Sequence, residues 1–200
     1  NQVVCNNTAT NAVNFSTTNT NGTTSYAWSI NTNIGLSPLT GTGDLPSFTA
    51  INTGTTPITA TITVTPTYNG TSICNGTSKT FTITVNPSGQ VNQPTNQVVC
   101  NNTATSTVNF STTNTVGTTS YAWSFDTNIG LIPLTGSGNI PSFTAINTGT
   151  TPIVATITVI PTFTNGATNC IGTPKTFTIT VNPSAQVNPI PNQTLCSNSS

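Results

Sequence analysis

Ionisable side chains are almost missing from this sequence of 200 residues. It contains two Lys or Arg residues, two Asp or Glu residues and no His, and its formal net charge is zero. General acid–base catalysis needs a positioned proton donor or acceptor, most often His or a carboxyl group. The composition therefore argues against an enzyme, and we expect no catalytic residue and no bound cofactor.

Clustered positive charge and long apolar runs are also missing. The two cations, Lys79 and Lys175, stand 96 residues apart in the sequence. Nucleic acids and anionic membranes attract proteins through clustered cations, so we expect neither partner. No apolar run approaches the roughly 20 residues that cross a bilayer, so membrane insertion of this segment is not expected.

Threonine and asparagine are the abundant polar residues of this sequence. The sequence has 49 Thr and 28 Asn residues, and hydrophobic residues make up 33% of it. Intrinsic disorder is typical of chains with low hydrophobicity and high net charge, and the second of these conditions is absent. A packed, Thr-rich β protein is the better prediction.

The sequence repeats itself. Residues 1–68 match residues 96–163 at 56 of 68 positions, and the match continues after one inserted residue near 166. A third copy begins at Asn192, so we expect the chain to belong to a longer exported polypeptide. The predicted organisation is repeat 1 at 1–87, a linker at 88–95, repeat 2 at 96–183, a linker at 184–191 and the start of a third repeat at 192–200.

Each full copy carries one early and one late cysteine. Cys5 and Cys74 fall in the first copy, Cys100 and Cys170 fall in the second, and Cys196 opens the third. This arrangement favours one bridge per copy, Cys5 with Cys74 and Cys100 with Cys170, in an oxidising extracellular compartment. Free buried thiols are the alternative. Metal ligation is disfavoured because soft-metal sites use clustered Cys, or Cys with His.

Short stretches with alternating apolar and polar residues predict β-strands separated by Gly, Pro and Asn turns. In the first copy the expected strands lie near 2–5, 12–18, 24–31, 47–52, 57–67 and 79–86. Alternation places Trp28 and Phe81 on inward faces, and Trp123 and Phe177 are their counterparts. These four residues are the predicted core anchors. Strands of this number and length, compatible with antiparallel pairing, favour tandem immunoglobulin-like β-sandwiches joined by short Pro-containing linkers.

Four stretches of the second copy have a recognisable pattern: Tyr121-Ala-Trp-Ser124, Ile140-Pro-Ser-Phe-Thr-Ala145, Ala155-Thr-Ile-Thr-Val159 and Gly172-Thr-Pro-Lys-Thr-Phe-Thr-Ile-Thr-Val-Asn-Pro183. They resemble the PKD-like repeats of secreted Bacteroidota surface proteins. The resemblance covers both full copies and the start of the third. Such repeats occur in tandem in giant adhesins, including the gliding-motility filament adhesin that type IX secretion exports. The resemblance implies an extracellular array of PKD-like, immunoglobulin-like domains.

The two acidic residues do not recur between the copies. Asp44 corresponds to Asn139, and Asp126 corresponds to Asn31. Paired carboxylates, which glycoside hydrolysis needs, are therefore not available to either copy. A calcium site built from several carboxylates is disfavoured for the same reason.

These observations favour a structural role. The leading hypothesis is the shaft of an extracellular bacterial surface filament or giant adhesin, serving gliding motility or surface attachment. Its expected partners are neighbouring repeats of the same chain and, through uncharged strands, other shafts. The alternative hypothesis is that the repeats bind surface glycan or ice directly through their outward Thr rows. The distal ligand is not predicted.

Overall fold

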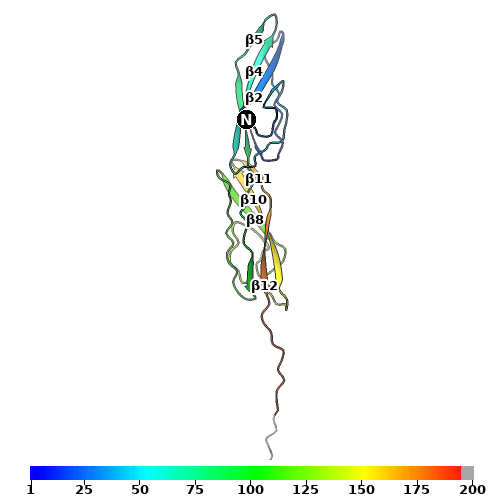
Figure 1. Ribbon diagram of the computed structural model, residues 1–200, viewed down its shortest axis with the longest axis vertical. Helices are drawn as coiled ribbons and strands as arrows, with labels where there is room; N and C mark the ends of the chain where they lie inside the picture. The colour runs from blue at the N-terminus through cyan, green and yellow to red at the C-terminus, as the bar shows by residue number, and fades with distance from the viewer. Residues whose placement is uncertain (195–200) are drawn as a thin grey trace, which may run out of the picture.

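The computed structural model describes residues 1–194, and these residues form strands and connecting loops without a helix. Its strands are β1 (Gln2–Cys5), β2 (Thr23–Ile30), β3 (Thr40–Thr42), β4 (Ile58–Asn69), β5 (Ile73–Asn75), β6 (Lys79–Asn86), β7 (Gln97–Cys100), β8 (Thr118–Phe125), β9 (Thr135–Ser137), β10 (Ile153–Asn165), β11 (Thr168–Ile171) and β12 (Lys175–Asn182). The expected all-β class is confirmed. Figure 1 shows an elongated molecule in which β1–β6 and β7–β12 follow one another along the long axis. We call these parts, residues 1–86 and 97–182, the first and second halves.

Two mixed sheets of six strands each have the same strand order, and together they are consistent with a β-sandwich architecture. The first sheet runs β1-β6-β4-β2-β3 with β5 beside β4, and the second runs β7-β12-β10-β8-β9 with β11 beside β10. β1 lies parallel to β6, and β7 lies parallel to β12, whereas the other pairs are antiparallel. The expectation of purely antiparallel pairing is therefore wrong. Parallel pairing needs a long connection, and nearly the whole half separates its first and last strands.

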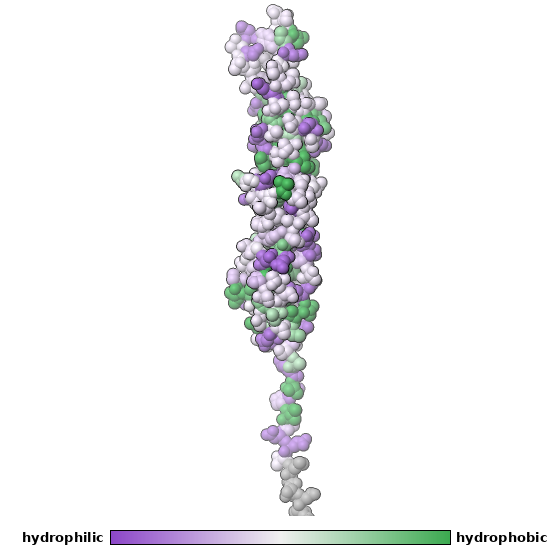
Figure 2. Space-filling model, turned by 90° about the vertical axis from the view of Figure 1, so that its left-hand side faces the viewer, coloured by the Kyte–Doolittle hydropathy of each residue, from purple (hydrophilic) through white to green (hydrophobic). Residues whose placement is uncertain are grey.

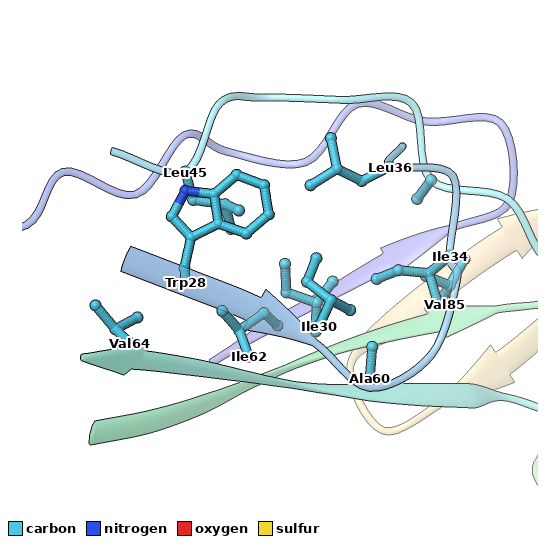
Figure 3. Packing of buried hydrophobic residues seen from close by; sticks show 11 residues of the cluster. Trp28, Ile30, Ile34, Leu36, Leu45, Ala60, Ile62, Val64 and Val85 are labelled. Carbon is cyan, nitrogen blue, oxygen red and sulfur yellow. The ribbon is translucent and has the colours of Figure 1, made fainter. Parts of the chain in front are cut away.

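The core lies on one face of each sheet, as the alternation predicts. Along β4, Ala60, Ile62 and Val64 are buried, and the Thr residues between them are partly exposed. Trp28 is buried on β2, and Figure 3 shows it projecting toward Leu45 on the chain segment that covers the sheet.

The other predicted core anchors occupy similar places. Trp123 and Phe177 are buried in the core of the second half. Phe81 is partly buried and packs against the core of the first half. The core prediction is therefore confirmed for Trp28, Trp123 and Phe177, and Phe81 lies at the margin of its core.

An irregular layer covers the core face of each sheet. The strands expected near 12–18 and 47–52 are not present, and only isolated antiparallel bridges occur there, Ala9 with Thr49 and Val13 with Leu45. Side chains replace part of the missing ladder: the amide of Phe48 donates to Oγ1 of Thr10 at 3.1 Å. Short polar side chains bond nearby backbone groups and so compete with strand pairing. This competition explains why these segments are not regular strands.

The face of the molecule drawn in Figure 2 has no large apolar or strongly hydrophilic patch. Figure 2 shows mostly pale residues of intermediate hydropathy, with small scattered purple and green patches. Lys79 and Lys175 are exposed at the starts of β6 and β12. The equivalent positions of these lysines in successive halves keep the two cations apart.

Candidate functional site: the interface between the two halves

The two halves are joined by a disulfide. β1 and β6 run side by side toward the second half and end together, with Cys5 opposite Asn86. The hairpin of β10 and β11 approaches from the second half and carries Cys170, which is buried. Cys5 and Cys170 form a disulfide with their Cα atoms 5.4 Å apart. The bond therefore links the end of one sheet to the start of the next.

This pairing overturns the predicted bridges Cys5–Cys74 and Cys100–Cys170. Cys74 pairs with Tyr68 near the end of β4. Cys5 pairs with the last residue of β6, and this end of β6 lies beside the start of β4. About ten residues of β4 separate the positions of the two cysteines along the sheet, which corresponds to roughly 30 Å. A disulfide needs Cα atoms about 4.4–6.8 Å apart. Among the described cysteines, Cys74 and Cys100 are free and exposed. Cys196 lies outside the described residues.

The segment that connects the halves enters the second half instead of bridging open solvent. Gly89 is buried, and its amide donates to the carbonyl oxygen of Cys170 at 3.1 Å. Gly172 lies directly beside it: a Cβ atom on Gly172 would lie 1.7 Å from the carbonyl oxygen of Gly89. A Cβ on Gly89 would lie 2.6 Å from the carbonyl oxygen of Pro161. Glycine at these two positions permits this close backbone approach because it has no Cβ atom.

Polar contacts continue this interface beyond Gly89. The amide of Gln90 donates to Oδ1 of Asn114 at 2.7 Å. Asn92 donates from its amide to the carbonyl oxygen of Ser111 and from Nδ2 to Oγ of Ser111, each at 2.8 Å. The side chain of Gln93 donates to the carbonyl oxygen of Thr176 at 2.8 Å. These bonds satisfy backbone and side-chain groups that docking removes from water.

Burial of one valine shows how much of the connecting segment is docked. Val91 is 5% exposed, whereas Val187, at the corresponding place after the second half, is 83% exposed. Burying a Val side chain stabilises by about 1.5 kcal/mol or more. Asn86 is also buried at the interface, where its Oδ1 accepts a hydrogen bond from Nδ2 of Asn165 at 2.9 Å. The segment expected as a linker is therefore part of a packed interface.

A loop of the first half completes this contact. The amide of Thr115 donates to the carbonyl oxygen of Thr55 at 3.1 Å. Asn114 donates from Nδ2 to the carbonyl oxygens of Thr55 and Ser88 at 3.4 and 3.3 Å. Asn114 thus contacts both the connecting segment and the body of the first half. Covalent, apolar and polar contacts all resist movement of one half against the other.

The acidic residues act as hydrogen-bond acceptors within the fold. Oδ1 of Asp126 accepts from the amide of Thr156 at 2.8 Å, and Oδ1 of Asn31 accepts from Thr61 at the same distance in the first half. The bond from the Thr156 amide holds the pKa of Asp126 below its ordinary value. An amide oxygen serves as well as a carboxylate oxygen in this role, which explains why Asp and Asn exchange between the halves.

Asp44 has the same kind of role. Its Oδ1 accepts from the amide of Phe15 at 2.8 Å, and Oδ1 of Asn139 accepts from Phe110 at 2.9 Å. Within residues 1–194, no three His, Cys, Asp or Glu side chains gather as a metal site would require. The interface between the halves, which contains the disulfide and the docked segment, is the candidate functional site.

The sequence contains a weak signal for this interface, although residues 88–95 are predicted to form a linker. Pro87-Ser-Gly-Gln-Val-Asn92 recurs as Pro183-Ser-Ala-Gln-Val-Asn188. An unconstrained linker has no need to repeat a valine and its polar neighbours. The residues of the second half that receive the segment, such as Asn114, recur in the first copy as well, but they come from separate strands and loops, so the sequence does not show that they meet the segment.

Comparison with known proteins adds no family. No protein-family model matches the sequence, and no curated protein matches it. The described part of the chain also contains no helix with the length and apolar character needed to cross a membrane.

Proposed function

We propose that this chain is a shaft segment of an extracellular bacterial surface filament or giant adhesin. Its two halves are interpreted as successive PKD-like, immunoglobulin-like β-sandwich domains. The sequence repeat, the shared strand order and the end-to-end arrangement in Figure 1 support this interpretation. The role is mechanical: the shaft holds a distal binding region away from the cell. The interdomain disulfide fits an oxidising environment outside the cytoplasm.

The Cys5–Cys170 disulfide carries the proposal because of where it directs tension. The two cysteines are 165 residues apart in the sequence. When the ends of the chain are pulled, the shortest covalent path passes from Cys5 through the disulfide to Cys170. The intervening residues, which include most of both cores, lie outside that path. Tension on the oxidised shaft is therefore not transmitted through most of its folded mass.

The strand arrangement gives the reduced protein a second resistance. β1 and β6 are parallel neighbours, paired from Gln2 with Ile83 to Cys5 with Asn86. The chain enters the first half before β1 and leaves it after β6, so pulling moves these strands in opposite directions along their length. Their hydrogen bonds are then loaded together in shear rather than one after another. Shear loading favours resistance to unfolding even without the disulfide.

Single-molecule force spectroscopy tests this function directly. The protein is pulled through handles at its two ends, before and after reduction with dithiothreitol. At about 3.4 Å per residue, release of the closed loop adds roughly 500–600 Å of extension that the oxidised protein lacks. The Cys5→Ser/Cys170→Ser double variant is the control and is expected to behave like the reduced protein under both conditions. Equal extension of the oxidised and reduced protein would contradict the proposal.

Lateral association of shafts is a separate part of the proposal. The exposed faces of the strands carry Thr rather than charge, and charge is the usual protection against edge-to-edge pairing. Sedimentation velocity across a wide concentration range measures association. A Cys74→Ser/Cys100→Ser/Cys196→Ser variant removes intermolecular disulfides from this test, and a strictly monomeric variant would exclude bundling.

A further inference from the structure

The first half contains a counterpart of the surface that the connecting segment occupies in the second half. It is a groove of about 740 Å³, lined by Ser16, Asn19, Pro66, Tyr68, Cys74 and Gly76 among others. The corresponding residues of the second half are Ser111, Asn114, Pro161, Phe163, Cys170 and Gly172, which meet the connecting segment and the disulfide. Residues 1–194 leave the groove of the first half open to solvent.

The hydrogen-bonding groups that bind the segment recur in this groove. Asn114 and Ser111 bind Gln90 and Asn92 in the second half, and the groove offers Asn19 and Ser16 at the same sequence positions. Thr17 bonds Asn19 through its Oγ1 at 2.9 Å, as Thr112 bonds Asn114 at 3.1 Å. The receptor side of the interface is therefore prearranged in the first half.

A donor for the groove is present at the other end of the molecule. Residues 183–188 follow β12 as residues 87–92 follow β6, and residues 184–188 are exposed. Cys100 lies opposite Asn182 at the end of β7, as Cys5 lies opposite Asn86 at the end of β1. Among the described residues, the first half thus has an open groove with a free thiol, and the second half has an exposed segment with a free thiol.

We propose that the groove of the first half binds residues 183–188 of a second copy of this chain, and that Cys100 of that copy forms a disulfide with Cys74. This inference rests on the proposed shaft function and names the partner of the groove. The contact is heterologous, with different surfaces on the two copies, so repetition of it produces an open linear chain rather than a closed dimer.

Formation of the bond needs an oxidant. Oxidised glutathione, a disulfide oxidant, first forms a mixed disulfide with one thiolate and releases one molecule of reduced glutathione. The second thiolate attacks the protein sulfur of the mixed disulfide and displaces another reduced glutathione. The Cys74–Cys100 bond replaces the glutathione disulfide, and the two thiol protons are transferred through solvent to the glutathione thiolates.

Two differences should make residues 183–188 bind less tightly than residues 87–92 do. Ala185 stands where the first segment has Gly89, whose added Cβ would lie 2.6 Å from a backbone oxygen. Pro189 stands in place of Gln93 and lacks the side-chain donor that reaches Thr176. We therefore expect Ala185→Gly to strengthen the contact on the order of tenfold, the effect of relieving a modest steric overlap.

Complementary cysteine variants test the proposal. Cys196 is replaced by Ser in every protein, so that it contributes no bond. Adding Cys74→Ser leaves only the donor thiol, and adding Cys100→Ser leaves only the receptor thiol. Mixed in a glutathione redox buffer, the two proteins should yield a heterodimer on non-reducing gels, with Cys74 and Cys100 joined in the tryptic peptides. Self-dimers formed as readily as the heterodimer would overturn the proposal.

A noncovalent measurement separates docking from thiol reactivity. A synthetic peptide with the sequence of residues 182–191 is titrated into the Cys74→Ser/Cys100→Ser/Cys196→Ser variant and followed by NMR. Shifts should centre on Asn19 and Tyr68, and Asn19→Ala should weaken binding. Absence of saturable shifts, or shifts spread over the whole surface, would overturn the docking site. The force measurement on a single chain would stand in that case, because it depends only on Cys5 and Cys170.

Discussion

Gly172 and Gly89 lie in backbone contact across the interface, because a Cβ on Gly172 would lie 1.7 Å from the carbonyl oxygen of Gly89. Gly172→Ala should therefore expel the connecting segment while both sheets stay folded. Hydrogen exchange at the Gly89 amide, which donates to Cys170, should become faster, and the far-ultraviolet spectrum should be unchanged.

Gly76→Ala is the matched control for this substitution. Gly76 occupies the corresponding position in the first half, where an added Cβ meets the ring carbon Cγ of Pro66 at 2.9 Å. This variant should leave exchange at Gly89 unaltered. Similar exchange rates at Gly89 in both variants would show that a Cβ at position 172 does not displace the connecting segment.

Val91→Asp should weaken the interface, and Val187→Asp should not. Val91 is buried and Val187 is exposed, so only the first substitution places a carboxylate in an apolar site. The cost of such burial is several kcal/mol unless the segment moves out. Small-angle scattering of both variants, with Cys5 and Cys170 replaced by Ser, should show a broader distribution of shapes for Val91→Asp alone. Indistinguishable profiles would contradict docking.

Gly41→Ala should destabilise the first half because of Trp28. A Cβ at this position would lie 2.2 Å from Cζ2 of the Trp28 ring, which is held in the core. Overpacking of this kind costs about 1–3 kcal/mol of unfolding free energy. Urea unfolding of the variant measures the loss.

Gly43→Ala is the control for that experiment. Apart from its chain neighbours, no residue comes within 4 Å of the added Cβ, but φ is +73°. The cost there is therefore conformational strain of about 1–2 kcal/mol. Replacing Trp28 by Phe should rescue part of the loss in Gly41→Ala and none of the loss in Gly43→Ala. Equal rescue of both variants would exclude the steric explanation.

Asp126 should make a small contribution to the dependence of stability on pH. Its pKa is lowered in the folded state by the hydrogen bond from the Thr156 amide. The contribution is therefore present above the unfolded pKa, near 4, and is lost as the pH falls through the lower folded value. Melting temperatures of the wild type should fall slightly between about pH 5 and pH 2.

Asp126→Asn should remove this slope and keep the fold. Asn31 already provides the same acceptor in the first half, where its Oδ1 accepts from Thr61 at 2.8 Å. Asp126→Ala should lower the melting temperature at every pH, because the Thr156 amide loses its partner. If Asp126→Asn keeps the wild-type dependence of melting temperature on pH, a group other than Asp126 causes it.

Local sequence pattern determined the all-β class, most strands and the core. Thr and apolar residues alternate with a period of two along β4 and β6, and a pleated strand sends alternate side chains to opposite faces. The burial of Trp28 and Trp123 follows from the same rule. The pattern failed at 12–18 and 47–52, where the side chains of Asp44 and Thr10 accept hydrogen bonds from the amides of Phe15 and Phe48 in place of a continuous ladder.

Only the tertiary structure decided which cysteines meet. The sequence by itself shows one early and one late cysteine in each copy, and the copies suggest that these form a pair. Because β1 pairs in parallel with β6, Cys5 lies at one end of the sheet and Cys74 lies at the other end. Cys5 is therefore beside Cys170 and far from Cys74. Strand direction and the docking of residues 87–93 depend on contacts between distant parts of the chain, and no local pattern encodes them.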